Sequence, residues 1–272
     1  MRLVVVGAGI AGSSATRIAR SKGWDVTLID HAPEQSASRS ALATIRPTWF
    51  DKSERAALER SWEWYSTWGA AGSREAYVSN WRNSEVKKQK DWWLVDPIVP
   101  LCKPNTVERV VRISDKNVEL SNGLSINADA ILNCTGAYGA DLAREVTLFA
   151  GVTWISHNAQ LDYEPYRVHH LRPYKSLSAA QINGVTRVGS SINASADKAI
   201  QEAKELLEQA HLLGIVKEGA SWDMSLGWRA KGAGGIPIYP KAGQRNAYFS
   251  GLARSGYGLA PAIAEKWLDT IG

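Results

Sequence analysis

The sequence VVVGAGIAGSSATRIARSKGWDVTLID, at Val4–Asp30, decides the fold. It opens with a short apolar strand, and a predicted helix and a second strand, Asp25–Ile29, follow. Between the first strand and the helix lie three glycines at the G-x-G-x-x-G spacing: Gly7, Gly9 and Gly12. Strand, glycine turn, helix and strand in this order are typical of a unit that binds a dinucleotide.

Each part of this unit has its own physical task. Gly7 allows a tight turn, Gly9 lets the backbone approach a pyrophosphate, and Gly12 allows the helix to pack closely on the strand. The free N–H groups at the start of the helix attract phosphate oxygens. Asp30, which ends the second strand, is placed to accept hydrogen bonds from a ribose. The structural alternative is a glycine-rich turn that binds nothing.

Length and composition limit the class of protein. The chain has 272 residues, of which 44% are hydrophobic and 22% charged, so we expect one large globular domain or two intertwined ones. No uncharged apolar stretch is long enough for a membrane span, so we expect no membrane partner. Cys102 and Cys134 are the only cysteines, which favours a reducing, cytoplasmic location. We find no pattern of metal ligands and expect no metal site.

A basic segment rich in tryptophan stands out in the middle of the chain. The net charge is +5, and the sequence WRNSEVKKQKDWW at positions 81–93 alternates cations with aromatic residues. Such a pattern can hold a phosphate backbone and stack on bases. The alternative is a solvated basic turn between two core tryptophans. The candidate nucleic-acid contacts are Arg82, Lys87, Lys88, Lys90 and Trp92.

Other patterns predict the remaining elements. Helical periodicity favours a helix over 53–68 and an amphipathic helix over about 197–213. Alternation and turn residues predict a β meander over 107–133 and strands over 152–192. A glycine loop near the end of the chain opens a final helix.

Four blocks of sequence resemble the FAD-dependent D-amino-acid oxidase superfamily, most of all its glycine oxidase branch. The chain is also similar to relatives that oxidise a carboxymethylamine group on a tRNA base. The blocks are GAGIAG (7–12), SASRSALATIRP (36–47), ADAILNCTGAYG (128–139) and the tail, with GWRAKGAGGIPIYP (227–240) and GLARSGYGLAPA (251–262). Ala230 and Gly234–Gly235 depart from the family pattern, and the stretch between Arg46 and Val107 is shorter than in typical members.

The resemblance implies an α/β fold with two domains. A Rossmann-type FAD-binding domain would comprise 1–50, 105–148 and 222–272. An inserted antiparallel β-sheet domain for the substrate, shortened here, would comprise 51–104 and 149–221. The shortened stretch predicts a more open site.

The resemblance also implies a non-covalent FAD and assigns site residues. Arg229 would anchor the substrate carboxylate, because a guanidinium can pair with both carboxylate oxygens, and Arg254 is the second candidate. Gly256 and Gly258 would bring backbone N–H groups near the flavin. Tyr138 and Tyr257 could line the site. Further candidate contacts to the cofactor are Ser36, Ser38, Arg39 and Gly136.

The activity implied is oxidation of glycine or an N-substituted glycine. Hydride transfer to flavin N5 would cleave the C–N bond and give glyoxylate, an amine and hydrogen peroxide. The substrate is either a free small amine or a glycine-modified base in DNA or RNA. Two other classes stay open: a different flavin- or nicotinamide-dependent dehydrogenase, and a non-catalytic nucleic-acid-binding module on an oxidase scaffold. The sequence does not indicate an oligomeric state.

Overall fold

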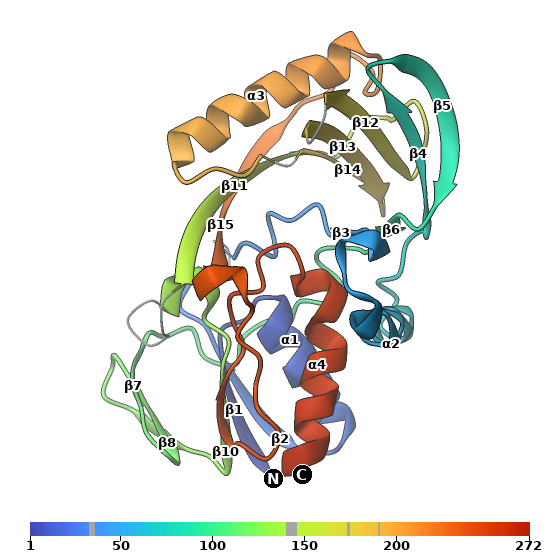
Figure 1. Ribbon diagram of the computed structural model, residues 1–272. Coiled ribbons are helices and arrows are strands. Elements are labelled where there is room, and N and C mark those ends of the chain that lie inside the picture. Colours follow the sequence, from blue (N-terminus) through green and yellow to red (C-terminus); the bar gives the residue numbers. More distant parts are fainter. Residues whose placement is uncertain (33–35, 140–145, 173–174, 190) are drawn as a thin grey trace.

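Two β-sheets of different type form the two halves of the molecule (Figure 1). The computed structural model describes residues 1–32, 36–139, 146–172, 175–189 and 191–272. A parallel sheet near the two chain ends carries the N-terminal glycine turn, and a larger sheet lies at the opposite end. This is the predicted α/β fold, with a Rossmann-type unit and an antiparallel β-sheet unit.

The parallel sheet combines distant parts of the chain. Its order is β16-β10-β1-β2, from Asn246–Tyr248, Ala130–Asn133, Arg2–Val6 and Asp25–Ile29. Strand β1 is buried on both faces, as is usual in a parallel sheet. Leu3 and Val5 pack with the helices α1 (Ile10–Ser21) and α4 (Gly256–Ile271). Val4 and Val6 pack against a three-stranded sheet on the other face, formed by β7 (Val110–Ile113), β8 (Asn117–Leu120) and β9 (Ser125–Asn127).

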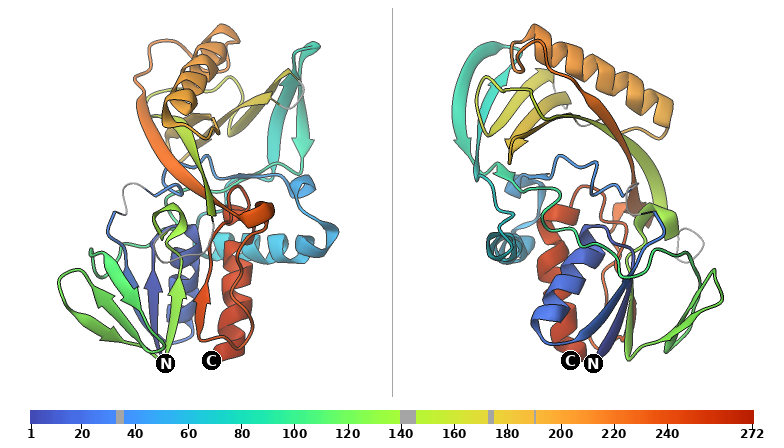
Figure 2. Two further views of the ribbon diagram at one scale, coloured as in Figure 1. Left: turned by 60° about the vertical axis from the view of Figure 1, so that its left-hand side comes forward. Right: turned by 180° about the vertical axis from the view of Figure 1, so that it is seen from behind.

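The larger sheet has seven strands in the order β15-β11-β14-β13-β12-β4-β5. Neighbours are antiparallel except for the parallel pair β4–β12. Helix α3 (Ala196–Leu212) covers one face and buries small and aliphatic side chains there (Figure 2). The strands are β4 (Glu75–Asn80), β5 (Asn83–Lys90), β11 (Val146–Ser156), β12 (Tyr166–Arg172), β13 (Lys175–Ile182), β14 (Val185–Gly189) and β15 (Asp223–Gly232).

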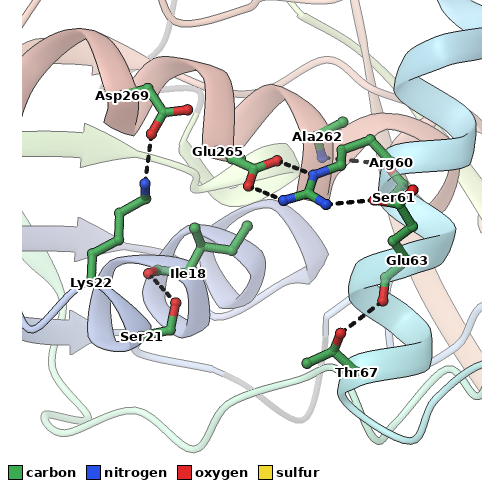
Figure 3. Close-up of polar contacts among 10 residues, drawn as sticks. All are labelled: Ile18, Ser21, Lys22, Arg60, Ser61, Glu63, Thr67, Ala262, Glu265 and Asp269. Carbon is green, nitrogen blue, oxygen red and sulfur yellow. Dashed lines mark hydrogen bonds and ion pairs between the residues drawn. The ribbon is translucent and has the colours of Figure 1, made fainter.

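Helix α2 (Arg55–Thr67) packs against α4 of the Rossmann-type unit. Figure 3 shows the guanidinium of Arg60 on the carboxylate of Glu265, with Nε and Nη2 each 2.6 Å from an oxygen. Tyr65 is fully buried and donates its hydroxyl to the backbone oxygen of Tyr257 at 2.8 Å. The two-stranded sheet of β3 (Thr44–Ile45) and β6 (Trp93–Leu94) lies next to this junction.

Several sequence-based expectations can be compared with these elements. The expected helices correspond to α2, α3 and α4. The expected meander is found only as far as β7, β8 and β9; its last segment, Ala130–Asn133, is β10, which pairs in parallel with β1 and β16 instead of with β9. The division into two domains stays a prediction. Helix α2, in the range predicted for the substrate domain, packs on α4 because its apolar face is buried there. Strand β15, in the range predicted for the FAD-binding domain, pairs along its length with β11, which spans the predicted boundary at residue 148. In the described part of the chain, no helix is long and apolar enough to cross a membrane.

Candidate active site

The glycine turn after β1 is built from close backbone approaches. Gly7 has φ of +104°, and a Cβ atom there would lie 2.4 Å from the carbonyl oxygen of Cys134. A Cβ atom on Gly12 would lie 1.9 Å from the carbonyl oxygen of Gly7. No other residue type fits either position without a shift of the backbone, so both glycines have the structural tasks that the sequence predicted.

Two serine hydroxyls lie at the N-terminus of α1. A Cβ atom on Gly9 would lie 3.2 Å from Oγ of Ser38 and 3.5 Å from Oγ of Ser36. The N–H of Ile10 donates to Oγ of Ser38 at 2.9 Å. The hydroxyl of Ser38 therefore keeps its own proton to donate, next to the positive end of the helix dipole. This arrangement of donors fits a diphosphate, as predicted for Gly9, Ser36 and Ser38.

Asp30 lies beside the same turn. Its carboxylate accepts the N–H of Ala8 at 2.6 Å and the N–H of Ala32 at 3.0 Å, which fixes the position of the side chain. The residue lines the cavity described next, so the predicted contact with a ribose stays a prediction that the geometry allows. Arg39 does not line this cavity; its backbone oxygen accepts a hydrogen bond from Arg187 at 3.1 Å.

A first cavity of about 660 Å³ extends from the glycine turn to β15. This volume is in the range of about 300–1,000 Å³ for cofactor and ligand sites. Gly136, Tyr138 and Gly256 line it, and Gly136 has φ of +58°. The hydroxyl of Ser250, which is buried and has no hydrogen-bond partner among the described residues, belongs to the same wall. The glycine cradle, the helix start and the cavity size thus fit a bound dinucleotide such as FAD.

Two predicted site residues have structural tasks instead. A Cβ atom on Gly258 would lie 2.6 Å from the ring of Phe50, so packing explains the glycine, and the residue does not line the first cavity. Tyr257 does not line it either. Its hydroxyl donates to the backbone oxygens of Ser38 at 2.9 Å and Pro97 at 2.7 Å, and burial raises its pKa. Tyr257 therefore connects the serine loop, residues 36–40, to the segment that contains Pro97.

Arg229 on β15 lies where the first cavity meets a second cavity of about 440 Å³. Its Nη1 donates to the backbone oxygen of Ser191 at 3.3 Å, and none of the ion pairs among the described residues involves it. Burial and the charge of Arg254 lower its pKa. A Cβ atom on Gly151 would lie 2.7 Å from the guanidinium carbon, so this glycine makes room for Arg229. Sequence reasoning missed Gly151, because only the pairing of β11 with β15 brings it there.

Arg254 lies in the turn before α4 and lines the second cavity together with Arg229. Its side chain is exposed, and its guanidinium carbon lies 5.3 Å from the ring centroid of Trp49. Cation–π contacts of this kind hold a guanidinium in one orientation. The structure thus brings together, on one cavity, the two arginines that the sequence singled out, and an anion bound there would be attracted by both.

The candidate nucleic-acid surface differs from the prediction at Trp92. This tryptophan is 4% exposed, its ring packs against Tyr166 and His170, and Arg46 lies 4.4 Å above it. Trp92 cannot stack on a base because it belongs to the core. The chain turns inward at Asp91, where φ is +66°, and this turn buries the tryptophan.

The lysines near Trp92 lie on β5, which is exposed along its length and forms the edge of the larger sheet. Lys87 pairs with Glu85 at 3.2 Å, and Lys88 pairs with Glu75. Lys90 is exposed on the same strand, at the register position opposite Glu75. The segment is therefore a β-hairpin whose lysines are partly neutralised by acidic neighbours. The sequence predicted either a nucleic-acid surface or a solvated basic turn, and the observed hairpin is an exposed edge strand.

The tip of this hairpin carries the remaining candidate. Arg82 lies 4.7 Å from the ring centroid of Trp81, which is 51% exposed. This cation and its aromatic neighbour face solvent, and nothing in their geometry identifies a nucleic acid.

Comparisons with known proteins support the class that fold and site define. Residues 2–84 match the family model DAO, described as FAD dependent oxidoreductase. This match confirms the resemblance to the D-amino-acid oxidase superfamily and the prediction of an FAD-dependent oxidoreductase. The matched residues include the glycine turn and the serine loop. A comparison with curated proteins finds no sequence relative.

Solved structures with the same fold cover nearly the whole chain. Iminodiacetate oxidase from Chelativorans sp. BNC1 is 18% identical with a TM-score of 0.75, over 99% of this chain and 95% of that chain. Glycine oxidase from Bacillus cereus ATCC 14579 is 12% identical with a TM-score of 0.75, over 99% and 94%. L-proline dehydrogenase from P. horikoshii is 17% identical with a TM-score of 0.72, over 99% and 92%. At these identities the likeness establishes the fold.

Proposed function

We propose that this protein is an FAD-dependent oxidase that cleaves the C–N bond of glycine or an N-substituted glycine. When bound, FAD would accept a hydride from the substrate and pass two electrons to oxygen. The substrate loses the hydride from its α-carbon, and water hydrolyses the resulting imine to glyoxylate and an amine. One molecule of oxygen and one of water are consumed, and one of hydrogen peroxide is released.

Arg229 is the observation that carries this proposal. A half-buried guanidinium with no acidic partner among the described residues is costly, because burial removes it from water and none of those residues neutralises its charge. A substrate carboxylate would remove that cost with two charge-assisted hydrogen bonds. Because Arg229 lies at the junction of the two cavities, the bound carboxylate would place the neighbouring α-carbon next to the cofactor site.

The names of two structural neighbours agree with this substrate class. Glycine oxidase and iminodiacetate oxidase are named for glycine and for a glycine that carries a second carboxymethyl group on nitrogen. L-proline dehydrogenase is named for a cyclic amino acid and as a dehydrogenase. Reoxidation by oxygen would distinguish the oxidase from a dehydrogenase.

We favour a free small amine over a glycine-modified base in nucleic acid. Trp92 is buried and two of the three lysines have acidic partners, so little of the predicted basic surface is left to bind phosphates.

The cytoplasmic location remains a proposal that rests on the two cysteines.

Anaerobic reduction of the bound flavin tests the proposal. We expect glycine or sarcosine to bleach the oxidised flavin, and an oligonucleotide with a glycine-bearing base to be no faster. Arg229→Ala should keep FAD and lower the rate of reduction at low substrate by at least about 100-fold, because two charge-assisted hydrogen bonds are lost. Arg245→Ala, an exposed arginine before β16 that lines neither cavity, is the matched control.

Unchanged reduction in Arg229→Ala would remove this residue from substrate binding. Bleaching by the oligonucleotide alone would show that the substrate is carried on nucleic acid. Protein that binds nicotinamide cofactors and no flavin would support the dehydrogenase alternative.

A further inference from the structure

The second cavity carries more positive charge than one carboxylate needs. Three of its lining residues are cationic: Arg229, Lys231 and Arg254. None of the described residues that line it is acidic; the others are apolar or neutral polar, with Asn193 among them. Arg229 and the turn 251–253 line both cavities. A ligand in the second cavity therefore lies directly beside the candidate cofactor site.

The local structure explains why these cations meet. Arg229 and Lys231 are two residues apart on β15, and alternation along a strand places both side chains on one face. A Cβ atom on Gly235 would lie 3.3 Å from Nζ of Lys231, so the ammonium lies over the backbone of the glycine turn after β15. Arg254 approaches from the turn before α4 and is oriented by the ring of Trp49.

Three positive charges in one cavity repel one another. Arg229 and Arg254 line the same cavity, and burial together with the charge of Arg254 lowers the pKa of Arg229. No ion pair among the described residues includes Arg229, Lys231 or Arg254. The carboxylate of glycine would neutralise the charge of Arg229 and leave those of Lys231 and Arg254, which have no acidic partner among the described residues. Both side chains are exposed, so they attract a second anionic group in the cavity without a large cost of burial.

We infer that the preferred substrate carries a second acidic group: an N-substituted glycine whose nitrogen substituent ends in a carboxylate. This inference rests on the proposed function. Arg229 binds the glycine carboxylate, and Arg254 with Lys231 binds the carboxylate of the substituent. Electrostatic attraction then selects the diacid over analogues of the same size whose substituent is uncharged, because these would leave Arg254 and Lys231 without an anionic partner in the ligand.

A pair of substrates that differ in one charge tests this inference. N-(2-carboxyethyl)glycine and its amide, N-(2-carbamoylethyl)glycine, have the same length and nearly the same shape. We expect kcat/KM for hydrogen peroxide formation to be at least about 10-fold higher with the diacid, which corresponds to about 1.4 kcal/mol. The double variant Arg254→Gln/Lys231→Gln should reduce this preference to about two-fold or less. Lys241→Gln, an exposed lysine outside the cavity, should retain it.

A binding measurement does not depend on turnover. Succinate and its monoamide, succinamate, are titrated calorimetrically into the FAD-loaded protein and into the single variant Lys231→Gln, whose exposed side chain is not needed for folding. We expect succinate to bind at least about 10-fold tighter than succinamate, with the difference reduced in the variant and by salt.

The outcomes separate the two proposals. Equal kcat/KM for diacid and amide, or equal binding of succinate and succinamate, overturns the second acidic group and leaves the oxidase proposal intact. If no glycine derivative reduces the flavin, the oxidase proposal fails, and the calorimetric comparison still decides whether the cavity selects dianions.

Discussion

Gly7 and Gly12 are two residues where the addition of one methyl group has a structural consequence at the cofactor site. Gly12 lies so close to the backbone of Gly7 that even a methyl group overlaps a carbonyl oxygen. The contact positions the start of α1, and with it the N–H groups that face the first cavity. Stability and cofactor binding therefore depend on the same atoms.

Gly12→Ala should lower the free energy of unfolding by about 1–3 kcal/mol, because the backbone must shift to relieve the overlap. Bound FAD, measured by flavin absorbance after gel filtration, should fall with it. Gly23→Ala is the control: φ is +76° there, but no atom lies within 4 Å of the added Cβ atom. This variant should lose about 1 kcal/mol from backbone strain and keep FAD. Equal FAD content in the two variants would contradict the prediction.

At the scale of elements, α2 is attached to α4 by a mixture of buried and surface contacts. Tyr65 lies in the core, while Arg60 and Glu265 close the outer edge of the junction with two parallel hydrogen bonds (Figure 3). Hydrogen bonds from Arg60 are the main cause of the lowered pKa of Glu265. Since protonation of this carboxyl weakens the pair, the attachment of α2 depends on pH.

Glu265→Gln should lower the free energy of unfolding by about 0.5–1 kcal/mol at neutral pH. The folded-state pKa of Glu265 is below its unfolded value, so the stabilisation is complete above the ordinary value of about 4.3 and disappears as pH falls through the lowered pKa. Urea unfolding of both proteins across this range measures the difference. Glu63→Gln, which changes a more exposed partner of Arg60, should have a smaller effect. A difference that stays constant into acid would show that the charge of Glu265 contributes nothing.

At the scale of the whole molecule, the basic strand and the candidate active site lie at opposite edges of the larger sheet. β15 is one edge strand and β5 is the other, with five strands between them. A charge on β5 is thus separated from Arg229 by the full width of the sheet, and exposed charges at such distances are screened by salt.

Combined substitution of Lys87, Lys88 and Lys90 by glutamine should leave kcat/KM for a free glycine substrate within about two-fold of the original value. Steady-state hydrogen peroxide formation is the measurement. Glutamine is chosen because it removes the positive charge and stays polar without adding repulsion to Glu75 and Glu85. A selective loss with an oligonucleotide substrate would instead support the nucleic-acid interpretation of β5.

A structural feature could be predicted from this sequence when it depends on residues close together in the chain. The Rossmann-type unit follows from about 30 adjacent residues, and the glycine tasks at Gly7 and Gly12 follow from spacing alone. Arg229 and Arg254 could be singled out because they lie in motifs. Trp92 was placed wrongly, because alternating cations and aromatics describe an exposed strand and its buried end equally well until the turn at Asp91 is known.

The sequence by itself determined the glycine turn after the first strand, the α/β class and the resemblance to the superfamily, since these depend on short-range spacing and on the hydrophobic pattern of single elements. Only the tertiary structure decided that α2 packs on α4, that β5 is an edge strand, and that Lys231 joins the two arginines in one cavity. Those features depend on pairings between residues far apart in the chain. Burial of apolar surface and strand hydrogen bonds select such pairings in the folded molecule, and no local pattern encodes them.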